Sequence, residues 1–198
     1  MKMRPLGATG INVSEIGFGT WGLGGDAYGP VDDQLSVDCL HHALDKGITF
    51  YDTASLYGGG HAEKILGQAF RKNRRDVVIA SKTKVPVSGD KESVLRYIQS
   101  ELDASLKRLG TDYLDLYLLH DPDIENINNT GAGVELLKEF KAGGRIKSWG
   151  ISVRSPQESF QAVERWGAEV LEVNYNLIDQ RCREIGLFDF ITTHNVGF

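Results

Sequence analysis

The chain has 198 residues, of which 41% are hydrophobic and 25% charged, a balance that is ordinary for a globular protein in water. Its net charge of −5 argues against nucleic-acid binding, which needs clustered basic side chains. We find no apolar run long enough for a membrane span and no signal-peptide pattern at the start. Cys39 and Cys182 lie in helix-like sequence without a partner motif, so we expect buried or half-buried thiols in a reducing compartment. A cytoplasmic protein that binds neither nucleic acid nor membrane is therefore expected.

Turn-forming residues shape the first part of the chain. Gly7, Gly10 and Asn12 separate short extended pieces and predict an N-terminal β-hairpin, and a strand is expected at 13–18. Residues 17–22 (GFGTWG) match the dinucleotide-binding pattern G-x-G-x-x-G. That pattern requires a helix to begin at the third glycine, whereas a loop follows here, so the match is a weak one.

Strands and helices then alternate along the chain. We expect further strands at 48–51, 76–81, 113–119, 146–151 and 170–173, helices at 32–46, 62–70, 92–109, 134–141, 156–166 and 183–193, and the beginning of another strand at 195–198. In the first helix the apolar positions at helical spacing are Leu35, Cys39 and Ala43. The alternation predicts a single α/β domain over residues 1–198 with a parallel sheet, built from about six strand–helix units and the start of a seventh strand. Periodicity alone leaves an open sheet and a closed barrel as alternatives.

Ionisable residues follow three successive strands at the point where each strand ends. Asp52, Lys82 and His120 occupy these positions, and Tyr57 follows Asp52 in the next loop. Because the carboxyl ends of parallel strands lie on one face, we expect these side chains to meet. Apolar strands do not need ionisable residues there in order to fold, so the pattern indicates a chemical site.

The four side chains suit one kind of chemistry. A tyrosine has an ordinary pKa near 10 and is a poor proton donor alone, but a neighbouring Lys82 ammonium would stabilise its phenolate. Asp52 would hold Lys82 in place, and His120 could hydrogen-bond the same substrate oxygen. The set fits protonation of a carbonyl oxygen while a hydride reaches the carbon. We find no activated nucleophile, and the His41–His42 pair faces different directions on a helix, so no metal site is expected.

Several motifs make the chain similar to the aldo-keto reductase family. They are Arg4-Pro-Leu-Gly with Thr9-Gly10 and Val13-Ser14, Gly17-Phe-Gly-Thr-Trp, Tyr51-Asp-Thr-Ala-Ser-Leu-Tyr-Gly, Ser81-Lys82, Leu118-Leu-His120, Trp149-Gly-Ile-Ser152 and Val173-Asn-Tyr-Asn176. The resemblance covers essentially the whole chain. It implies a TIM-type (β/α)8 barrel, here incomplete, that reduces aldehydes and ketones to alcohols with NADPH.

The resemblance also implies roles for individual residues. The catalytic set would be Asp52, Tyr57, Lys82 and His120, with Tyr57 as the general acid. Residues expected at the cofactor are Gly19, Thr20, Trp21, Asp52, Ser152 and Glu172. Two positions depart from the family pattern. Val153 follows Ser152 where an asparagine is common, and Glu172 stands where a glutamine usually contacts the nicotinamide carboxamide.

The length departs from the family as well, since members have eight strand–helix units. Three interpretations remain open: a C-terminally truncated chain, a homo-oligomer that covers the open barrel edges, and a protein without tight cofactor binding. The alternatives to a reductase are accordingly a catalytically weak binding or regulatory protein, similar to potassium-channel β subunits, and a truncated product. The sequence fixes neither the identity of the carbonyl substrate nor the choice between NADPH and NADH.

Overall fold

The computed structural model describes residues 1–198 and contains two sheets. The predicted hairpin is formed by the antiparallel strands β1 (Met3–Pro5) and β2 (Asn12–Ser14). Six parallel strands form the main sheet in chain order. They are β3 (Gly17–Gly19), β4 (Phe50–Asp52), β5 (Val78–Thr83), β6 (Leu114–His120), β7 (Ile146–Ser152) and β8 (Val170–Glu172).

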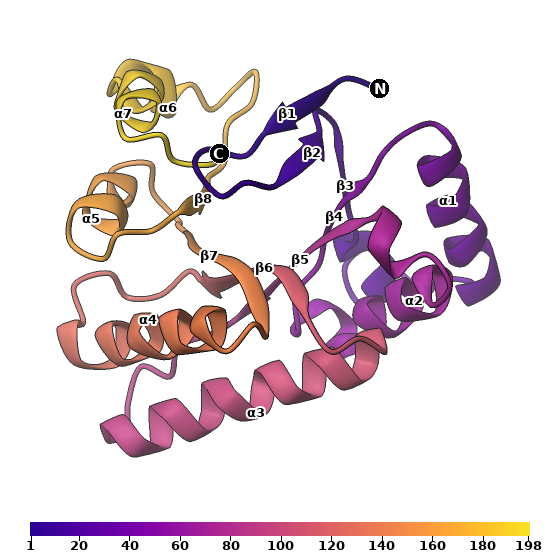
Figure 1. Ribbon diagram of the computed structural model, residues 1–198, viewed down its shortest axis with the longest axis horizontal. Coiled ribbons are helices and arrows are strands. Elements are labelled where there is room, and N and C mark those ends of the chain that lie inside the picture. Colours follow the sequence, from indigo (N-terminus) through magenta and orange to yellow (C-terminus); the bar gives the residue numbers. More distant parts are fainter.

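The helices lie along the outer side of this curled sheet (Figure 1). They are α1 (Asp33–Asp45), α2 (His61–Phe70), α3 (Lys91–Leu109), α4 (Ile127–Ala142), α5 (Glu158–Glu164), α6 (Arg181–Glu184) and α7 (Leu187–Thr193), with short 3₁₀ turns η1 (Trp21–Gly24), η2 (Tyr57–Gly60) and η3 (Arg74–Asp76). Consecutive parallel strands joined by outer helices form an incomplete (β/α)8 barrel, which confirms the predicted fold class. None of the helices is both long and apolar enough to cross a bilayer.

Three helical predictions need correction. The buried face of α1 includes Val37, Leu40 and Ala43, whereas Leu35 and Cys39 are exposed, so the prediction was right for Ala43 and wrong for Leu35 and Cys39. The apolar residues of α1 are spread around the helix, and α2 and the sheet cover the side that carries Val37 and Leu40.

The other two corrections concern helix ends. Helix α4 begins at Ile127 rather than at Val134, because the Asn126 side chain caps it by accepting a hydrogen bond from Asn129 N at 3.0 Å. The predicted helix 183–193 is divided into α6 and α7 at Gly186, whose φ of +73° is outside the helical region.

Strand alternation separates two apolar clusters. The outer faces of the strands pack with the helices in a cluster of 35 buried residues, which includes Tyr51, Tyr117 and Trp149. The inner faces form a smaller cluster with the hairpin: Leu6, Val13, Ala80, Leu116, Leu118 and Val170. The hairpin thus covers the inner face of the sheet, and the next inward position on each strand is free to carry chemistry.

The C-terminal residues lie against β8. Gly197 forms an isolated parallel bridge with Val170, and Leu171 N donates to Gly197 O at 2.8 Å. This contact is consistent with the strand expected to begin at 195–198.

A buried ion pair secures β5 from the outer side. Glu63 of α2 has no exposed surface, accepts a hydrogen bond from Ser81 Oγ at 2.6 Å, and pairs with Arg108 Nε at 2.5 Å. The pair joins α2, α3 and β5, so the helical layer and the strand hold a common position.

We predict that Gly150→Ala disrupts the pairing of β7 with β8. A Cβ at Gly150 would lie 2.2 Å from Val170 O, a backbone atom that cannot turn away. The substitution should lower the free energy of unfolding by at least about 2 kcal/mol, as overpacking does. Gly143→Ala is the matched control, since its nearest contact would be 3.4 Å and its φ is −80°. Urea unfolding of both variants measures the difference; equal midpoints would contradict the prediction.

Candidate active site

Strand register brings the polar ends of five strands to one end of the sheet. A residue at or next to the end of each of these strands is in phase with the inward-facing residues of that strand. These residues are Asp52, Lys82, His120, Ser152 and Glu172. His120 is paired in register with Ser152, and Ser152 with Glu172, so three of these side chains form a row across neighbouring strands. The predicted convergence at the carboxyl ends is therefore seen in the structure.

Lys82 is the buried centre of this group, with no exposed side-chain surface. Its Nζ forms an ion pair with Asp52 Oδ1, lies 3.3 Å from Glu172 Oε2, and donates to Thr53 O at 3.0 Å. Burial lowers the pKa of Lys82, but the two carboxylates outweigh burial and hold the pKa above its ordinary value. Lys82 is therefore a permanent cation at neutral pH.

Tyr57 enters the site from η2. Its ring centroid lies 5.3 Å from Lys82 Nζ and 6.2 Å from the ring centroid of His120, with the two rings nearly perpendicular. Burial raises the pKa of Tyr57 above its ordinary value, Lys82 lowers it, and Asp52 and Glu172 raise it. The phenol consequently keeps its proton at neutral pH, beside a cation that would stabilise the phenolate.

The loop that carries Tyr57 is fixed by a close backbone contact. A Cβ on Gly58 would lie 2.1 Å from Gly24 O, and the φ of Gly58 is +59°. Only glycine fits at this crossing of η1 and η2. The crossing places the ring of Trp21, from η1, 6.5 Å from the ring of Tyr57.

His120 is a neutral group in this site. Burial and the positive charges of Lys84 and Lys82 lower the pKa of His120 to about 4. Its Nδ1 is buried and has no hydrogen-bond partner within the protein. A neutral imidazole with an unused nitrogen can donate or accept one hydrogen bond without carrying charge.

Glu172 holds a position that the sequence did not predict. It was expected only as a contact for a cofactor amide, but it lies beside Lys82 and accepts a hydrogen bond from Ser152 Oγ at 3.4 Å. Although 42% of its side-chain surface is open, burial of the carboxyl group raises the pKa of Glu172 to about 7; Lys82 lowers it and Asp52 raises it. The group is thus poised to change charge near neutral pH.

The expected cofactor residues at the end of β3 lie in different surroundings. Trp21 is 52% exposed and lines the site. Thr20 is buried, and both its N and its Oγ donate to Asp52 O at 2.9 Å, so it positions the backbone of Asp52. Gly19 faces an apolar cavity of about 330 Å³ on the inner side of the sheet, which Asp52 and Glu172 also line.

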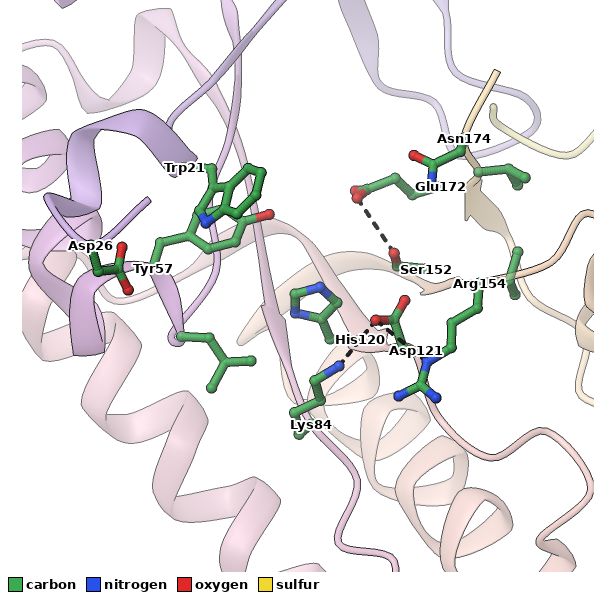
Figure 2. Close-up of a pocket in the computed structure, with 13 residues that line it drawn as sticks. Trp21, Asp26, Tyr57, Lys84, His120, Asp121, Ser152, Arg154, Glu172 and Asn174 are labelled. Carbon is green, nitrogen blue, oxygen red and sulfur yellow. Dashed lines mark hydrogen bonds and ion pairs between the residues drawn. The ribbon is translucent and has the colours of Figure 1, made fainter. Parts of the chain in front are cut away.

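A cleft of about 690 Å³ is lined by Tyr57, His120 and Glu172, among others, but not by Asp52 or Lys82 (Figure 2). Tyr57 and Trp21 form one side, Ser152, Glu172 and Asn174 another, and His120 lies between them. Three charged lining residues that follow strand ends were missed by the sequence reasoning: Lys84, Asp121 and Arg154. Lys84 Nζ and Arg154 Nε lie 3.1 Å and 3.8 Å from Asp121 Oδ2. Each of the three lies within two residues of a strand end, and this position in the sequence could have indicated that it lines the site.

The arrangement combines a protonated phenol and a neutral hydrogen-bonding imidazole, which line one cleft, with a permanent cation buried beside the phenol. Such a set can deliver a proton to an oxygen atom and stabilise the negative charge left behind. No three side chains are grouped as metal ligands.

Comparison with known proteins gives a consistent family. The Aldo/keto reductase family model matches residues 15–198. The chain is 37% identical over 193 residues to the aldo-keto reductase YhdN of Bacillus subtilis, covering 93% of this chain and 56% of that protein. The chain therefore spans little more than half the length of this relative.

Solved structures agree with that match. The holo form of an aldo-keto reductase from Bacillus halodurans superposes with a TM-score of 0.83 at 30% identity, over 99% of this chain and 64% of that one. An aldo-keto reductase from Klebsiella pneumoniae in complex with NADPH gives a TM-score of 0.79 at 31% identity, over 99% and 66% of the two chains.

We predict that His120 remains neutral well below the pH at which an ordinary histidine gains its proton. Its pKa of about 4 lies below the unfolded value near 6.5, so the unfolded chain binds the proton more readily between these values. Acidification from pH 6.5 towards 4 should therefore reduce the free energy of unfolding, and His120→Gln should lack this component. Carbon-13 histidine NMR, assigned with that variant, measures the titration; a midpoint above 6 would contradict the prediction.

Proposed function

The chain belongs to the aldo/keto reductase family, and on that premise we propose that it reduces the carbonyl group of small aldehydes and ketones to an alcohol. The observation that carries this proposal is the buried Lys82, paired with Asp52 and lying beside the protonated Tyr57 and the neutral His120. We propose these four residues as the catalytic set.

We propose NADPH as the cofactor, as in the complex of the Klebsiella pneumoniae relative. The cleft fits such a group, because it is large, is bordered by the exposed indole of Trp21, and contains the polar side chains of Ser152 and Glu172. The residues that would hold it are Gly19, Thr20, Trp21, Asp52, Ser152 and Glu172, with Thr20 acting through the backbone of Asp52. When bound, NADPH supplies a hydride for the carbonyl carbon.

The chain's own residues would control the proton. Tyr57 donates its phenolic proton to the carbonyl oxygen, and the Lys82 ammonium stabilises the resulting phenolate. Asp52 keeps Lys82 in this position. His120, being neutral, donates an N–H hydrogen bond that orients the same oxygen without competing as an acid. Each such electrostatic contact at a water-poor site is worth about 10²–10³ in rate.

The location and assembly of the protein belong to the same proposal. Cys39 and Cys182 are free thiols, which suits the reducing cytoplasm. The main sheet has β3 at one edge and β8 at the other, and a second copy of the chain covering an edge would remove exposed backbone groups.

We predict that Tyr57→Phe lowers carbonyl-dependent oxidation of NADPH at least about 100-fold, because it removes the proton donor and leaves the ring packing in place. Tyr97→Phe, on α3 and outside the cleft, is the control and should keep wild-type turnover. Loss of NADPH absorbance with a panel of aldehydes measures the effect. Equal turnover in Tyr57→Phe and wild type would contradict the assignment.

We further predict saturable NADPH binding that quenches tryptophan fluorescence, since Trp21 borders the cleft. Trp21→Phe should lose most of the quenching, because the other two tryptophans, Trp149 and Trp166, do not line the cleft. Binding without turnover on any aldehyde would instead support a binding or regulatory role. Absence of saturable binding would contradict the cofactor proposal for this chain.

A further inference from the structure

Glu172 makes contacts that hydrogen-bonding a cofactor amide does not require. It is the last residue of β8 and approaches Lys82 on β5, a strand that is separated from β8 by β6 and β7. The Lys82 ammonium thus pairs with Asp52 and also lies 3.3 Å from Glu172. Ser152 from β7 donates to the second oxygen of the same carboxyl group.

The groups around Glu172 have opposing effects on its protonation, so neither the carboxylate nor the protonated acid is strongly favoured. Lys82 favours its carboxylate, whereas Asp52 and burial favour the protonated acid. Two carboxylates beside one ammonium carry a net charge of about −1 when both are ionised, and about 0 when one is protonated. The other charged or titratable groups that line the cleft are Asp26, Tyr57, Lys84, His120, Asp121 and Arg154.

The same chain contains a comparable triad outside the site. Glu169, just before β8, accepts a hydrogen bond from Ser148 Oγ at 2.6 Å and pairs with Lys141 Nζ at 2.6 Å. A serine on β7 and a lysine flank a glutamate in both places. Glu169 does not line the cleft, so it is an internal control for what such a triad does structurally.

We propose that Glu172 is a positioning residue that acts as a second counter-ion of Lys82, so that its protonation decides how fully Lys82 supports the phenolate of Tyr57. The inference rests on the proposed proton delivery by Tyr57. With Glu172 ionised, Lys82 is shared between two carboxylates, and a phenolate would add a third negative charge nearby. With Glu172 protonated, the Lys82 ammonium is available to the phenolate, and Tyr57 is the stronger acid.

The pH dependence follows from these two states. Since the pKa of Glu172 is about 7, the protonated state is dominant at pH 6 and a minority at pH 8. If that state alone supports fast proton delivery, the reduction rate of wild type falls about tenfold between pH 6 and pH 8. Glu172→Gln keeps the shape and an accepting oxygen but cannot ionise, so its rate should stay near the low-pH level of wild type.

The coupling between Glu172 and Tyr57 can be tested by a measurement that needs neither cofactor binding nor turnover. The tyrosinate absorbance of the protein is titrated in wild type, Glu172→Gln, and each of these combined with Tyr57→Phe, so that the difference isolates Tyr57. The titration midpoint of Tyr57 should shift downwards in Glu172→Gln, because a neighbouring negative charge has been removed. Glu169→Gln should leave the midpoint unchanged even if it destabilises the fold.

The outcomes separate this inference from the proposed reductase activity. A midpoint of Tyr57 that is unchanged or higher in Glu172→Gln overturns the inference, whether or not the protein turns over. A downward shift in a protein without turnover supports it and contradicts only the reductase proposal. If Glu172→Gln does not fold, carbon-13 carboxyl NMR of wild type decides: titration of Glu172 near pH 7 with a coupled change at Tyr57 supports the inference, and titration near pH 4.5 overturns it.

Discussion

A fully buried ammonium ion is the constraint on which this structure depends. Lys82 has no exposed side-chain surface, and an unpaired charge in that position would cost several kcal/mol. The chain meets this cost with three contacts from two separate segments: Asp52 at the end of β4 with the carbonyl oxygen of the next residue, Thr53, and Glu172 at the end of β8. The contacts that offset the free-energy cost of burying Lys82 also fix the spacing between distant strands of the sheet. The contacts around Lys82 therefore serve both stability and the proposed chemistry, because the cation that must be neutralised is also the one that would stabilise a phenolate.

The part of the site that the sequence predicts is the part set by strand periodicity. Side chains alternate between the faces of a strand, so a polar residue in phase with inward apolar neighbours must point to the interior. Asp52, Lys82 and His120 follow this rule, and their approach to one another could be expected from their positions at strand ends. The fold class follows similarly from the alternation of strands and helices. Neither inference needs knowledge of any loop.

What the sequence could not predict depends on packing between segments. The position of Tyr57 depends on the crossing of η1 and η2, where Gly24 and Gly58 are in contact. No local sequence pattern predicts that contact. The last predicted helix is divided where Gly186 adopts a positive φ, and the exposed side of Cys39 depends on which face of α1 the neighbouring elements cover. Glu172 was assigned a role by resemblance alone. Its proximity to Lys82 arises because the curled sheet brings β8 towards β5, a long-range effect of curvature.

The ion pair on the outer face of β5 makes the site sensitive to residues that never contact it. Glu63 holds Ser81, the immediate neighbour of Lys82, and Arg108 holds Glu63. A side chain that points outward from a strand and one that points inward share the same backbone, so displacement of either is transmitted to the other within one residue. Random mutagenesis scored by turnover would accordingly return α2 and α3 positions among its strongest hits, and a survey of the cleft surface alone would leave those hits unexplained.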